Sequence, residues 1–257
     1  MAVLGIDIGG SGIKGAPVDL QTGALLGERF RVETPHPAKL DDVIDAVGEV
    51  ITHFNWRGPV GIGFPGVIKQ GVVWTAANLH KSWIGINAEM LIARRTGCGI
   101  TLINDADAAG LAEMHFGAGR GRRELVLMVT IGTGIGTALF MNGQLVPNLE
   151  LGHLTVRGKE AERRASDRAR SEKELSWKAW SKRLNEVLLY MEQLLWPDLI
   201  IIGGGVSKNY AKFCEHLTLR TPVERAQLLN NAGIIGAALT QTDEAASADD
   251  SDDFDDD

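Results

Sequence analysis

The chain has 257 residues, of which 44% are hydrophobic and 31 are glycine, and its formal net charge is −7. This length exceeds that of a typical compact domain and predicts two lobes, and the glycine content is typical of an α/β protein with many tight turns. No apolar run is long enough to cross a membrane, and no basic segment followed by an apolar one opens the chain, so we expect a cytoplasmic protein with no membrane partner. Cys98 and Cys214 lie far apart and form no paired metal-ligand motif, which fits a reducing compartment.

The negative charge is concentrated at the C-terminus. Residues 243–257 include nine acidic residues and no basic one, whereas the rest of the chain has 24 acidic and 26 basic residues. This composition predicts a disordered acidic tail over 243–257. The tail either keeps the protein in solution or competes with an anionic ligand, and its composition favours the first role.

The chain opens with a predicted β-hairpin. Val3–Ile8 and Ile13–Asp19 are apolar strands on either side of a glycine-rich turn. The next predicted elements are a helix over 40–54, strands over 60–64 and 71–74, a helix over 87–96 closed by Gly97, and a strand over 100–103. The last strand leads into Asn104, Asp105 and an alanine-rich helix.

A second glycine-turned hairpin opens the C-terminal half. Its strands are predicted over 125–131 and 135–140, and Asn142-Gly143 then favours a type I′ turn into a strand over 144–146. The remaining predicted elements are a helix over 172–196, a strand over 199–202 with a helix after its glycines, and a closing helix over 226–240. The repeated hairpin predicts two related lobes facing each other across a cleft, which we place at 1–103 and 104–242.

Three glycine-rich turns, each directly after an apolar strand, are suited to binding phosphate through consecutive backbone N–H groups. They are Gly9-Gly10-Ser11-Gly12, Gly132-Thr133-Gly134 and Gly203-Gly204-Gly205. One such turn is more often structural, but three together favour a phosphate site. Lys14 follows the first turn and can meet a phosphate, and Asp7 precedes it and can hold magnesium directly or through water. No Gly-Lys-Ser/Thr occurs, and the first turn leads into a strand, so neither a P-loop nor a dinucleotide fold is indicated.

Polar residues that suit phosphoryl transfer to a sugar follow two of the predicted strands. Asp105 ends a buried strand and is the best candidate for the general base, although it could instead cap the helix that follows. Asp107 competes for both roles. Asn104 and the pair Glu150 and His153 are suited to binding sugar hydroxyls, although a single histidine is more often structural.

The order of these motifs resembles that of the ROK sugar kinases over nearly all of residues 3–240. The matching motifs are Asp7-Ile8-Gly9-Gly10-Ser11, Gly61-Ile62-Gly63-Phe64-Pro65-Gly66, Asn104-Asp105, Gly132-Thr133-Gly134-Ile135-Gly136, Glu150-Leu151-Gly152-His153 and Gly203-Gly204-Gly205. The resemblance implies the α/β actin-like ATPase fold, also called the hexokinase–actin–chaperone fold, with sugar and phosphate donor meeting between two α/β lobes. It implies Asp105 as the catalytic base. The implied sugar ligands are Asn104, Glu150 and His153, with Asn78 and Gly66 as weaker candidates.

The chain departs from the ROK pattern in an informative way. Members of the family usually follow Glu-x-Gly-His with a cysteine-rich zinc motif, but no cysteine lies between Cys98 and Cys214, so we expect no structural zinc. Glu162 resembles the glutamate that ends this motif and is a further candidate sugar ligand. ROK repressors carry a DNA-binding segment before the first phosphate loop, whereas Asp7 comes at once here, which argues against a nucleic-acid partner.

In several of these departures the chain resembles the polyphosphate glucokinases of actinobacteria. The features are the missing cysteines, the short chain, Ser11 in place of threonine, and Leu79-His80-Lys81-Ser82-Trp83. This resemblance implies transfer of phosphate from polyphosphate, and from ATP as well, to the 6-hydroxyl of glucose by a homodimer. We expect magnesium to be required with the donor, because lysine alone cannot neutralise the charge of the transferred phosphoryl group. A strictly ATP-dependent glucokinase is the first alternative. A non-catalytic sugar sensor is the second, and intact Asp105 and phosphate loops argue against it.

A polyphosphate site also requires positive charge along the donor. One basic cluster is formed by Arg120, Arg122 and Arg123, and another by Arg163, Arg164, Arg168 and Arg170. Each is either a donor track or a solvated surface. Glu160, Glu162 and Asp167 interrupt the second cluster and favour ordinary pairing along a helix.

Overall fold

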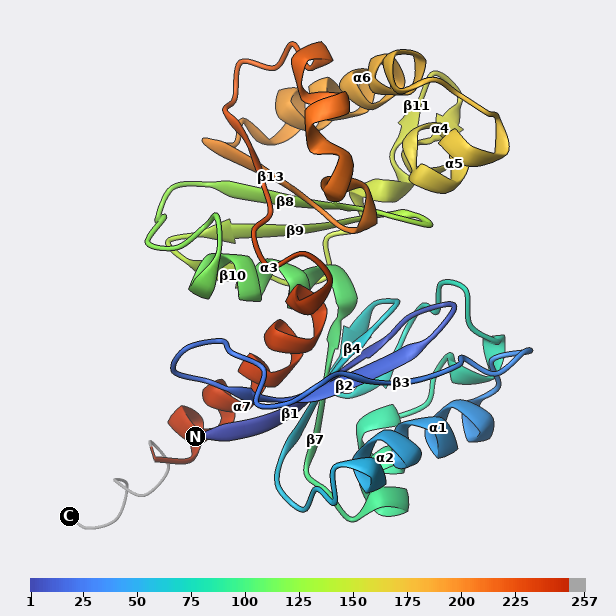
Figure 1. Ribbon diagram of the computed structural model, residues 1–257, viewed down its shortest axis with the longest axis vertical. Helices are drawn as coiled ribbons and strands as arrows, with labels where there is room; N and C mark the ends of the chain where they lie inside the picture. The colour runs from blue at the N-terminus through green and yellow to red at the C-terminus, as the bar shows by residue number, and fades with distance from the viewer. Residues whose placement is uncertain (250–257) are drawn as a thin grey trace, which may run out of the picture. The chain divides into compact units, whose positions relative to one another are not determined.

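Two five-stranded sheets with the same topology form the fold (Figure 1). The strand order is β3-β2-β1-β4-β7 in the first sheet and β10-β9-β8-β13-β14 in the second. In each sheet the first three strands of this order are antiparallel and the last three are parallel. The structure is a computed structural model that describes residues 1–249. The matching sheets confirm the predicted internal repeat.

In each sheet the three antiparallel strands follow one another directly along the chain, and helices precede the parallel strands added after them. The first sheet contains β1 (Ala2–Ile8), β2 (Ile13–Asp19), β3 (Phe30–Val32), β4 (Val60–Phe64) and β7 (Ile100–Asn104). The second contains β8 (Val126–Ile131), β9 (Ile135–Met141), β10 (Gln144–Val146), β13 (Leu199–Gly203) and β14 (Val223–Arg225). Two small ribbons pair β5 (Ile68–Lys69) with β6 (Val72–Val73) and β11 (Thr155–Val156) with β12 (Lys159–Glu160).

The α-helices are α1 (Leu40–His53), α2 (Ala88–Thr96), α3 (Asp105–Phe116), α4 (Ala161–Ala165), α5 (Asp167–Glu172), α6 (Trp177–Leu195) and α7 (Ala232–Asp249). Short 3-10 helices are η1 (Lys81–Trp83), η2 (Leu151–His153), η3 (Gly205–Lys212), η4 (Cys214–His216) and η5 (Leu229–Asn231). Among the residues that the structure describes, no helix has both the length and the apolar character needed to cross a membrane.

The chain divides into two compact units. The first comprises Met1–Ala108 and the segment from Gly233 onward, and the second comprises Ala109–Ala232. The observed units therefore differ from the predicted lobes, 1–103 and 104–242, at both junctions. The first junction falls inside α3, and α7 belongs to the first unit because its backbone packs against β1 and β4. No local pattern in the sequence marks a helix that returns to the opening sheet.

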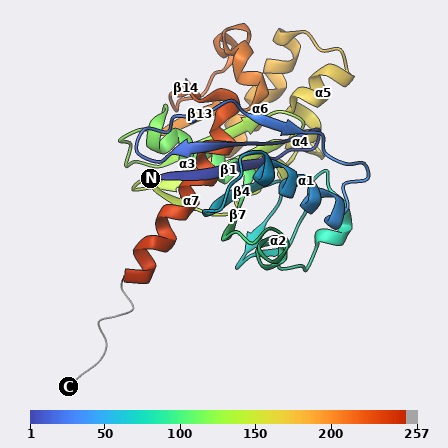
Figure 2. The same cartoon turned by 60° about the horizontal axis from the view of Figure 1, so that its bottom comes forward.

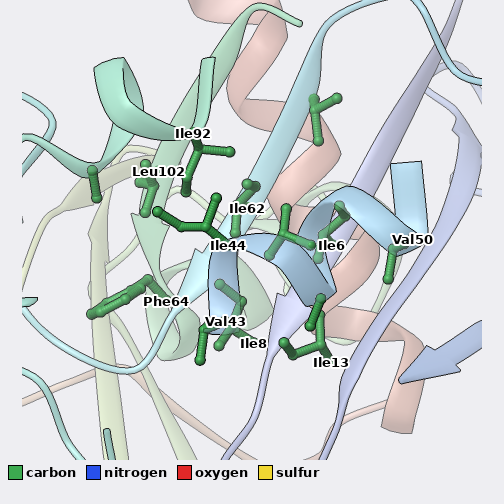
Figure 3. Packing of buried hydrophobic residues seen from close by; sticks show 14 of the residues in the cluster. Ile6, Ile8, Ile13, Val43, Ile44, Val50, Ile62, Phe64, Ile92 and Leu102 are labelled. Atoms are coloured by element: carbon green, nitrogen blue, oxygen red, sulfur yellow. The ribbon is translucent and has the colours of Figure 1, made fainter. Parts of the chain in front are cut away.

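The core of the first unit lies between its sheet and α1. Every third or fourth residue of α1 is buried, including Val43, Val47 and Val50, as its helical spacing predicts. Figure 3 shows Ile44 close to Ile62 of β4 among the other side chains of this cluster. Burial of each such aliphatic side chain contributes about 1.5–3 kcal/mol, so this face positions β1 and β4 firmly.

Helix α7 covers the opposite face of the same sheet (Figures 1 and 2). Side chains alternate along a strand, so Gly5 of β1 faces α7 when its neighbours face α1. Gly61 of β4 is the register partner of Gly5. A Cβ atom at either glycine would overlap a backbone carbonyl of α7, at Ile234 or at Ala237. These two glycines therefore permit the close approach of helix and sheet.

In the second unit, α6 packs on one face of the sheet. Its buried side chains include Trp180, Leu184 and Leu188, and the Trp180 indole N–H donates to the Ala165 carbonyl at 3.0 Å. The C-terminal half of α3 covers the other face, where Gly110 lies against the ring of Phe140. The second unit thus has the same layers as the first, with helices on both faces of its sheet.

A buried carboxylate joins two loops of the second unit. Glu113 of α3 is fully buried and accepts backbone N–H bonds from Ala118 at 2.9 Å, Gln227 at 3.0 Å and Leu228 at 2.7 Å. Three hydrogen bonds compensate for the removal of this charge from water. Glu113 therefore holds the segment after β14 against the end of α3.

Several predicted boundaries in the second unit are wrong. The helix predicted over 172–196 begins only at Trp177, because the Ser176 hydroxyl caps it by accepting the Ala179 N–H at 3.2 Å. Glu174 has a φ of 47°, which interrupts the helical path after α5. The helix expected after Gly205 is the 3-10 helix η3.

The C-terminal prediction also needs correction. The segment predicted to open the closing helix at residue 226 instead follows the short parallel strand β14, and α7 begins at Ala232. Residues 243–249, predicted as part of a disordered tail, continue α7. The rest of that predicted tail lies outside the described residues.

Local turn predictions are confirmed. Gly97 ends α2 with a φ of 72°, and Asn142 and Gly143 have φ values of 56° and 78°, which a type I′ turn requires. The opening hairpin pairs β1 with β2 in the expected antiparallel arrangement. These features depend on a few consecutive residues, and so the sequence predicts them well.

Candidate functional site

The predicted carboxylates of the first unit lie at one edge of its sheet. Strands β1, β4 and β7 are parallel, with Asp7 beside Gly63 and Gly63 beside Ile103. Asp7 therefore stands near the carboxyl end of β1, and Asp105 follows the carboxyl end of β7. Strand β4 lies between these two strands. In open α/β sheets, ligands bind outside this edge.

The first glycine turn exposes its amide groups. The Gly9 N–H donates to the Gly12 carbonyl at 3.1 Å, and the Thr34 hydroxyl donates to the Gly9 carbonyl at 2.6 Å. The carbonyls of Gly9 and Gly12 thus accept hydrogen bonds from within the protein. The N–H groups of Gly10 and Ser11 have no hydrogen-bond partner within the described structure, and both residues are exposed. This arrangement suits an anion.

Asn104, rather than Asp105, caps α3. The Asn104 side-chain carbonyl accepts the backbone N–H of Ala106 at 2.8 Å and of Asp107 at 3.1 Å. The Asn104 amide also donates to the Gly66 carbonyl at 3.2 Å. Asp105 is therefore not the N-cap, which was the structural alternative to a catalytic role. The Asp107 residue is only 1% exposed, whereas Asp105 is partly exposed.

The two weaker sugar-ligand candidates lie near these groups. A Cβ atom at Gly10 would lie 3.3 Å from the Asn78 Cβ, so Asn78 lies beside the first glycine turn. Asn78 is exposed and has a φ of 61°. Gly66 is tied to Asn104 through its carbonyl, and a side chain there would overlap the Thr75 carbonyl.

Burial raises the pKa of Asp7 above its ordinary value of 3.8, and the neighbouring Lys14 ammonium opposes this shift. Lys14 is the register partner of Asp7 on β2, and a Cβ atom at Gly233 would lie 3.2 Å from the Asp7 carboxyl carbon. A carboxylate held in this environment is destabilised relative to one in water. A cation bound beside it would compensate for that cost.

In the second unit, Glu162 lies against the second glycine turn. A Cβ atom at Gly134 would lie 2.6 Å from a Glu162 carboxylate oxygen. The turn closes with the Gly132 N–H donating to the Gly134 carbonyl at 3.0 Å, and the Asp167 N–H donates to the Gly132 carbonyl at 3.0 Å. Thr133 is exposed at its tip. The structure thus brings a predicted phosphate loop and a predicted sugar ligand together within one unit.

The imidazole of His153 stands between two carboxylates. Its Nε2 lies 3.6 Å from a Glu150 oxygen, and its Nδ1 lies 3.5 Å from a Glu160 oxygen. The other Glu160 oxygen receives the Arg163 Nε–H at 2.7 Å. Glu150 precedes η2 and His153 is its last residue, and the buried Gly152 between them allows η2 to pack against the Ile135 backbone. The sequence analysis missed Glu160 as a site residue, although its spacing of three from Arg163 suggested a surface pair.

His153, Glu160 and Glu162 could together hold a metal ion, because one ligand atom of each lies within 4.8 Å of the others. Their nitrogen and oxygen atoms are acceptable ligands for several divalent metals. Arg163 also pairs with Glu160, which competes with such a role.

The third glycine turn lies beside the second. Gly204 has a φ of 74°, and a Cβ atom there would lie 2.6 Å from backbone atoms of Ile131, at the end of β8. The Ser207 hydroxyl donates to the Gly204 carbonyl at 2.8 Å, and Gly205 is exposed. The turns after β8 and β13 therefore share the carboxyl edge of the second sheet, as parallel strands require.

Many arginines of the two basic clusters are ion-paired. Arg122 contacts Glu124 at 3.0 Å and Glu224 at 3.2 Å. In the other cluster, the pairs are Arg163 with Glu160, Arg164 with Glu186, and Arg170 with Asp167. This pairing favours the ordinary surface interpretation for the second cluster.

The structure therefore assembles two groups of predicted residues, one within each unit. Asp7, Lys14, Asn104 and Asp105 lie at the edge of the first sheet with the first glycine turn. The second group comprises Gly132, Thr133, Gly134, Glu150, His153, Glu162, Gly204 and Gly205.

Residues 3–169 match the model of the ROK family. The chain is 51% identical over 236 residues to polyphosphate glucokinase of Mycobacterium tuberculosis (strain CDC 1551 / Oshkosh), an alignment that covers 91% of this chain and 89% of that protein. The crystal structure of inorganic polyphosphate/ATP-glucomannokinase from Arthrobacter sp. strain KM superposes with a TM-score of 0.92 at 48% identity, over 95% of this chain and 99% of the other.

A more distant structure shares the fold. It is a ROK family glucokinase from Streptomyces griseus in complex with glucose and AMPPNP, with a TM-score of 0.80 at 24% identity over 93% of this chain and 99% of the other. Together with the repeated sheet topology, these matches confirm the fold and the family expected from the motifs. The chain is a member of the ROK family and has the actin-like ATPase fold.

Proposed function

We propose that this protein is a polyphosphate glucokinase, which transfers a phosphoryl group from polyphosphate, and also from ATP, to the 6-hydroxyl of glucose. The observation that carries this proposal is the 51% identity to a polyphosphate glucokinase over 91% of the chain. The polyphosphate/ATP-glucomannokinase structure, at 48% identity, supports the use of both donors.

Asp105 acts as the general base in this proposal. Its carboxylate takes the proton of the sugar 6-hydroxyl while that oxygen forms a bond to the terminal phosphorus of the donor. The bond from this phosphorus to the bridging oxygen breaks, and a polyphosphate shorter by one unit, or ADP, leaves. Because Asn104 supplies the helix cap, the base role of Asp105 does not compete with capping of α3.

The sugar is held by carboxylate, imidazole and amide groups. We assign Glu150, His153 and Glu162 to its hydroxyls, since charged acceptors form strong hydrogen bonds with them. Asn104 contributes through its side-chain amide, beyond its bond to Gly66. Asn78, beside the first glycine turn, is the weaker candidate.

The phosphate chain is bound by the backbone amides of the glycine turns and by Lys14. Magnesium fits beside Asp7, because magnesium in kinases is held by one or two carboxylates together with substrate phosphates. When bound, magnesium neutralises charge on the phosphoryl group. The buried Asp7 carboxyl, with its raised pKa, would be stabilised by this cation.

Replacing Asp7 with asparagine should separate activity from stability. We expect the kcat/KM for the donor to fall about tenfold or more, because the magnesium ligand is lost. The free energy of unfolding at pH 7 should not fall. The folded-state pKa of Asp7 lies above the unfolded value of 3.8, so its charged form costs stability, and this cost builds up as the pH rises from 3.8 through the folded pKa and is complete at higher pH.

Urea denaturation at several pH values measures the stability part of this prediction. The advantage of the Asp7→Asn variant should shrink as the pH falls through the raised folded-state pKa of Asp7, and it should vanish below 3.8, where Asp7 is protonated in both the folded and the unfolded states. A variant that is less stable than the wild type at pH 7 would contradict the assigned direction of the pKa shift.

We also propose that the protein contains no structural zinc, because the thiolate ligands of the related zinc motif are missing. Metal analysis after dialysis should find no stoichiometric zinc. One zinc per chain would refute this expectation, and substitution of His153, Glu160 or Glu162, whose ligand atoms lie within 4.8 Å of one another, would then test where it binds.

The decisive experiment measures glucose 6-phosphate formation with polyphosphate or ATP as the sole donor. Activity with polyphosphate confirms the proposal, and activity with ATP alone supports the strictly ATP-dependent alternative. Glucose binding without turnover by either donor would indicate a sugar sensor.

The resemblance to actinobacterial enzymes further leads us to propose a cytoplasmic homodimer, and the two free thiols fit a reducing compartment. Sedimentation of the purified protein tests the dimer.

A further inference from the structure

Arg31 on β3 lies directly over the first glycine turn. Its Nη2 donates to the Ser11 carbonyl at 2.5 Å. A Cβ atom at Gly12 would lie 2.5 Å from the Arg31 Nε and 2.8 Å from its Cζ, so the guanidinium covers the Cα of Gly12. Only a glycine leaves room for it there. None of the expected site residues came from β3.

Arg31 and Lys14 form a pair of cations across two strands. Lys14 lies on β2, where it is the register partner of Asp7 on one neighbouring strand, β1, and of Arg31 on the other, β3. Register partners project from the same face of a sheet, and adjacent strands lie about 4.8 Å apart. Positive charge therefore extends from Lys14 on β2 to Arg31 on β3, which is the outermost strand on this side of the sheet.

The charge of Arg31 is not neutralised by a carboxylate. Its one hydrogen bond in the described part of the chain goes to a neutral backbone carbonyl, and no Asp or Glu oxygen there lies within 4.0 Å of its guanidinium. The guanidinium carries five N–H groups, of which this bond uses one. By contrast, Arg122 and Arg163 are paired with glutamates. Arg31 thus combines exposure, charge and proximity to a turn that presents backbone amides.

We propose that Lys14 and Arg31 form an anion subsite for the phosphate chain of the donor, in which Arg31 binds phosphates beyond the one that is transferred. This inference rests on the proposed kinase function and names the part of the site that favours polyphosphate. Polyphosphate continues as a line of negative charge past the reacting group, whereas ATP ends in a nucleoside. A cation one strand farther out therefore benefits the polymeric donor more.

Arg31→Gln is the informative variant, because glutamine can still donate to the Ser11 carbonyl but carries no charge. We expect the KM for long-chain polyphosphate to rise about tenfold at low salt and the KM for ATP to change by less than about twofold. The difference should shrink as salt rises. Arg31→Lys, which keeps the charge, should recover most of the affinity for polyphosphate.

Arg57→Gln serves as the matched control. Arg57 is exposed in the same unit and precedes β4, so it stands at the opposite end of the sheet from the turn that follows β1. The Arg57→Gln substitution removes the same charge, and the KM for long-chain polyphosphate and the KM for ATP should both stay as in the wild type. An equal loss for both donors in Arg31→Gln, or no loss for either, would overturn the proposed subsite.

A second measurement separates this inference from the kinase function itself. Calorimetric titration with inorganic tripolyphosphate reports anion binding without turnover. If the wild type shows no kinase activity with any donor, the proposed function fails. The subsite nevertheless stands if Arg31→Gln weakens tripolyphosphate binding about tenfold while Arg57→Gln does not. Unchanged tripolyphosphate affinity in Arg31→Gln overturns it whatever the activity.

Discussion

Replacing Asp105 with asparagine should lower kcat about a hundred-fold or more with either donor, while glucose affinity survives. The amide preserves the shape of the side chain but cannot accept the proton of the sugar hydroxyl. The variant should keep the N-terminal cap of α3, because Asn104 rather than Asp105 makes the cap bonds. Glucose 6-phosphate formation and glucose binding, measured on the same preparation, distinguish loss of chemistry from loss of the sugar site.

Asp107→Asn is the control for this assignment. Asp107 also stands in the first turn of α3, but its side chain is buried, so its replacement should affect stability more than turnover. If Asp105→Asn kept a third of the wild-type kcat and Asp107→Asn did not, the base role would belong to Asp107. If both variants kept at least a third of the wild-type kcat, neither carboxylate of this helix would be the general base.

Replacing Gly61 with valine should lower the free energy of unfolding by about 3 kcal/mol or more. The reason is that a Cβ atom at Gly61 overlaps the Ala237 carbonyl of α7, and a helix backbone cannot yield as a side chain can. Strand propensity alone predicts the opposite sign, since valine is favoured over glycine in strands. Urea denaturation of the purified variant measures the change.

Gly48→Ala provides the matched control. Gly48 lies within α1, and a Cβ atom there would meet nothing within 4 Å. Alanine should therefore raise the free energy of unfolding by about 0.5–1 kcal/mol, through reduced freedom of the unfolded chain and better helix propensity. Were Gly61→Val as stable as Gly48→Ala, the close packing of α7 on the first sheet would be incorrect.

Local features of this protein were predictable from the sequence. The opening hairpin, the left-handed Gly97 at the end of α2 and the turn at Asn142-Gly143 all depend on a few neighbouring residues. The three glycine turns after apolar strands likewise indicated phosphate loops. The chain order of these turns, taken together with the motifs at 61–66, 104–105 and 150–153, was enough to indicate the family, because motif order is itself a property of the sequence.

Elements whose formation depends on distant partners were not predictable. The strand β14 has only three residues and forms because β13 offers it an edge. Helix α7 returns to the first unit because Gly5 and Gly61 leave room for its backbone, and nothing within 232–249 signals that contact. Glycines within strands are ambiguous until the neighbouring element is known.

The same division holds within the candidate site. The sequence by itself determined which residue types and loops suit phosphoryl transfer, because those motifs are contiguous. It left Asp105 between a cap and a base, and only the tertiary structure showed that Asn104 makes the cap bonds. Glu160 and Arg31 entered the site only through the folded chain, which sets Glu160 beside His153 and pairs Arg31 with Lys14 across two strands. Strand register and sheet pairing arise from non-local packing, so the position of a lone charged residue relative to a loop is decided only when the chain is folded.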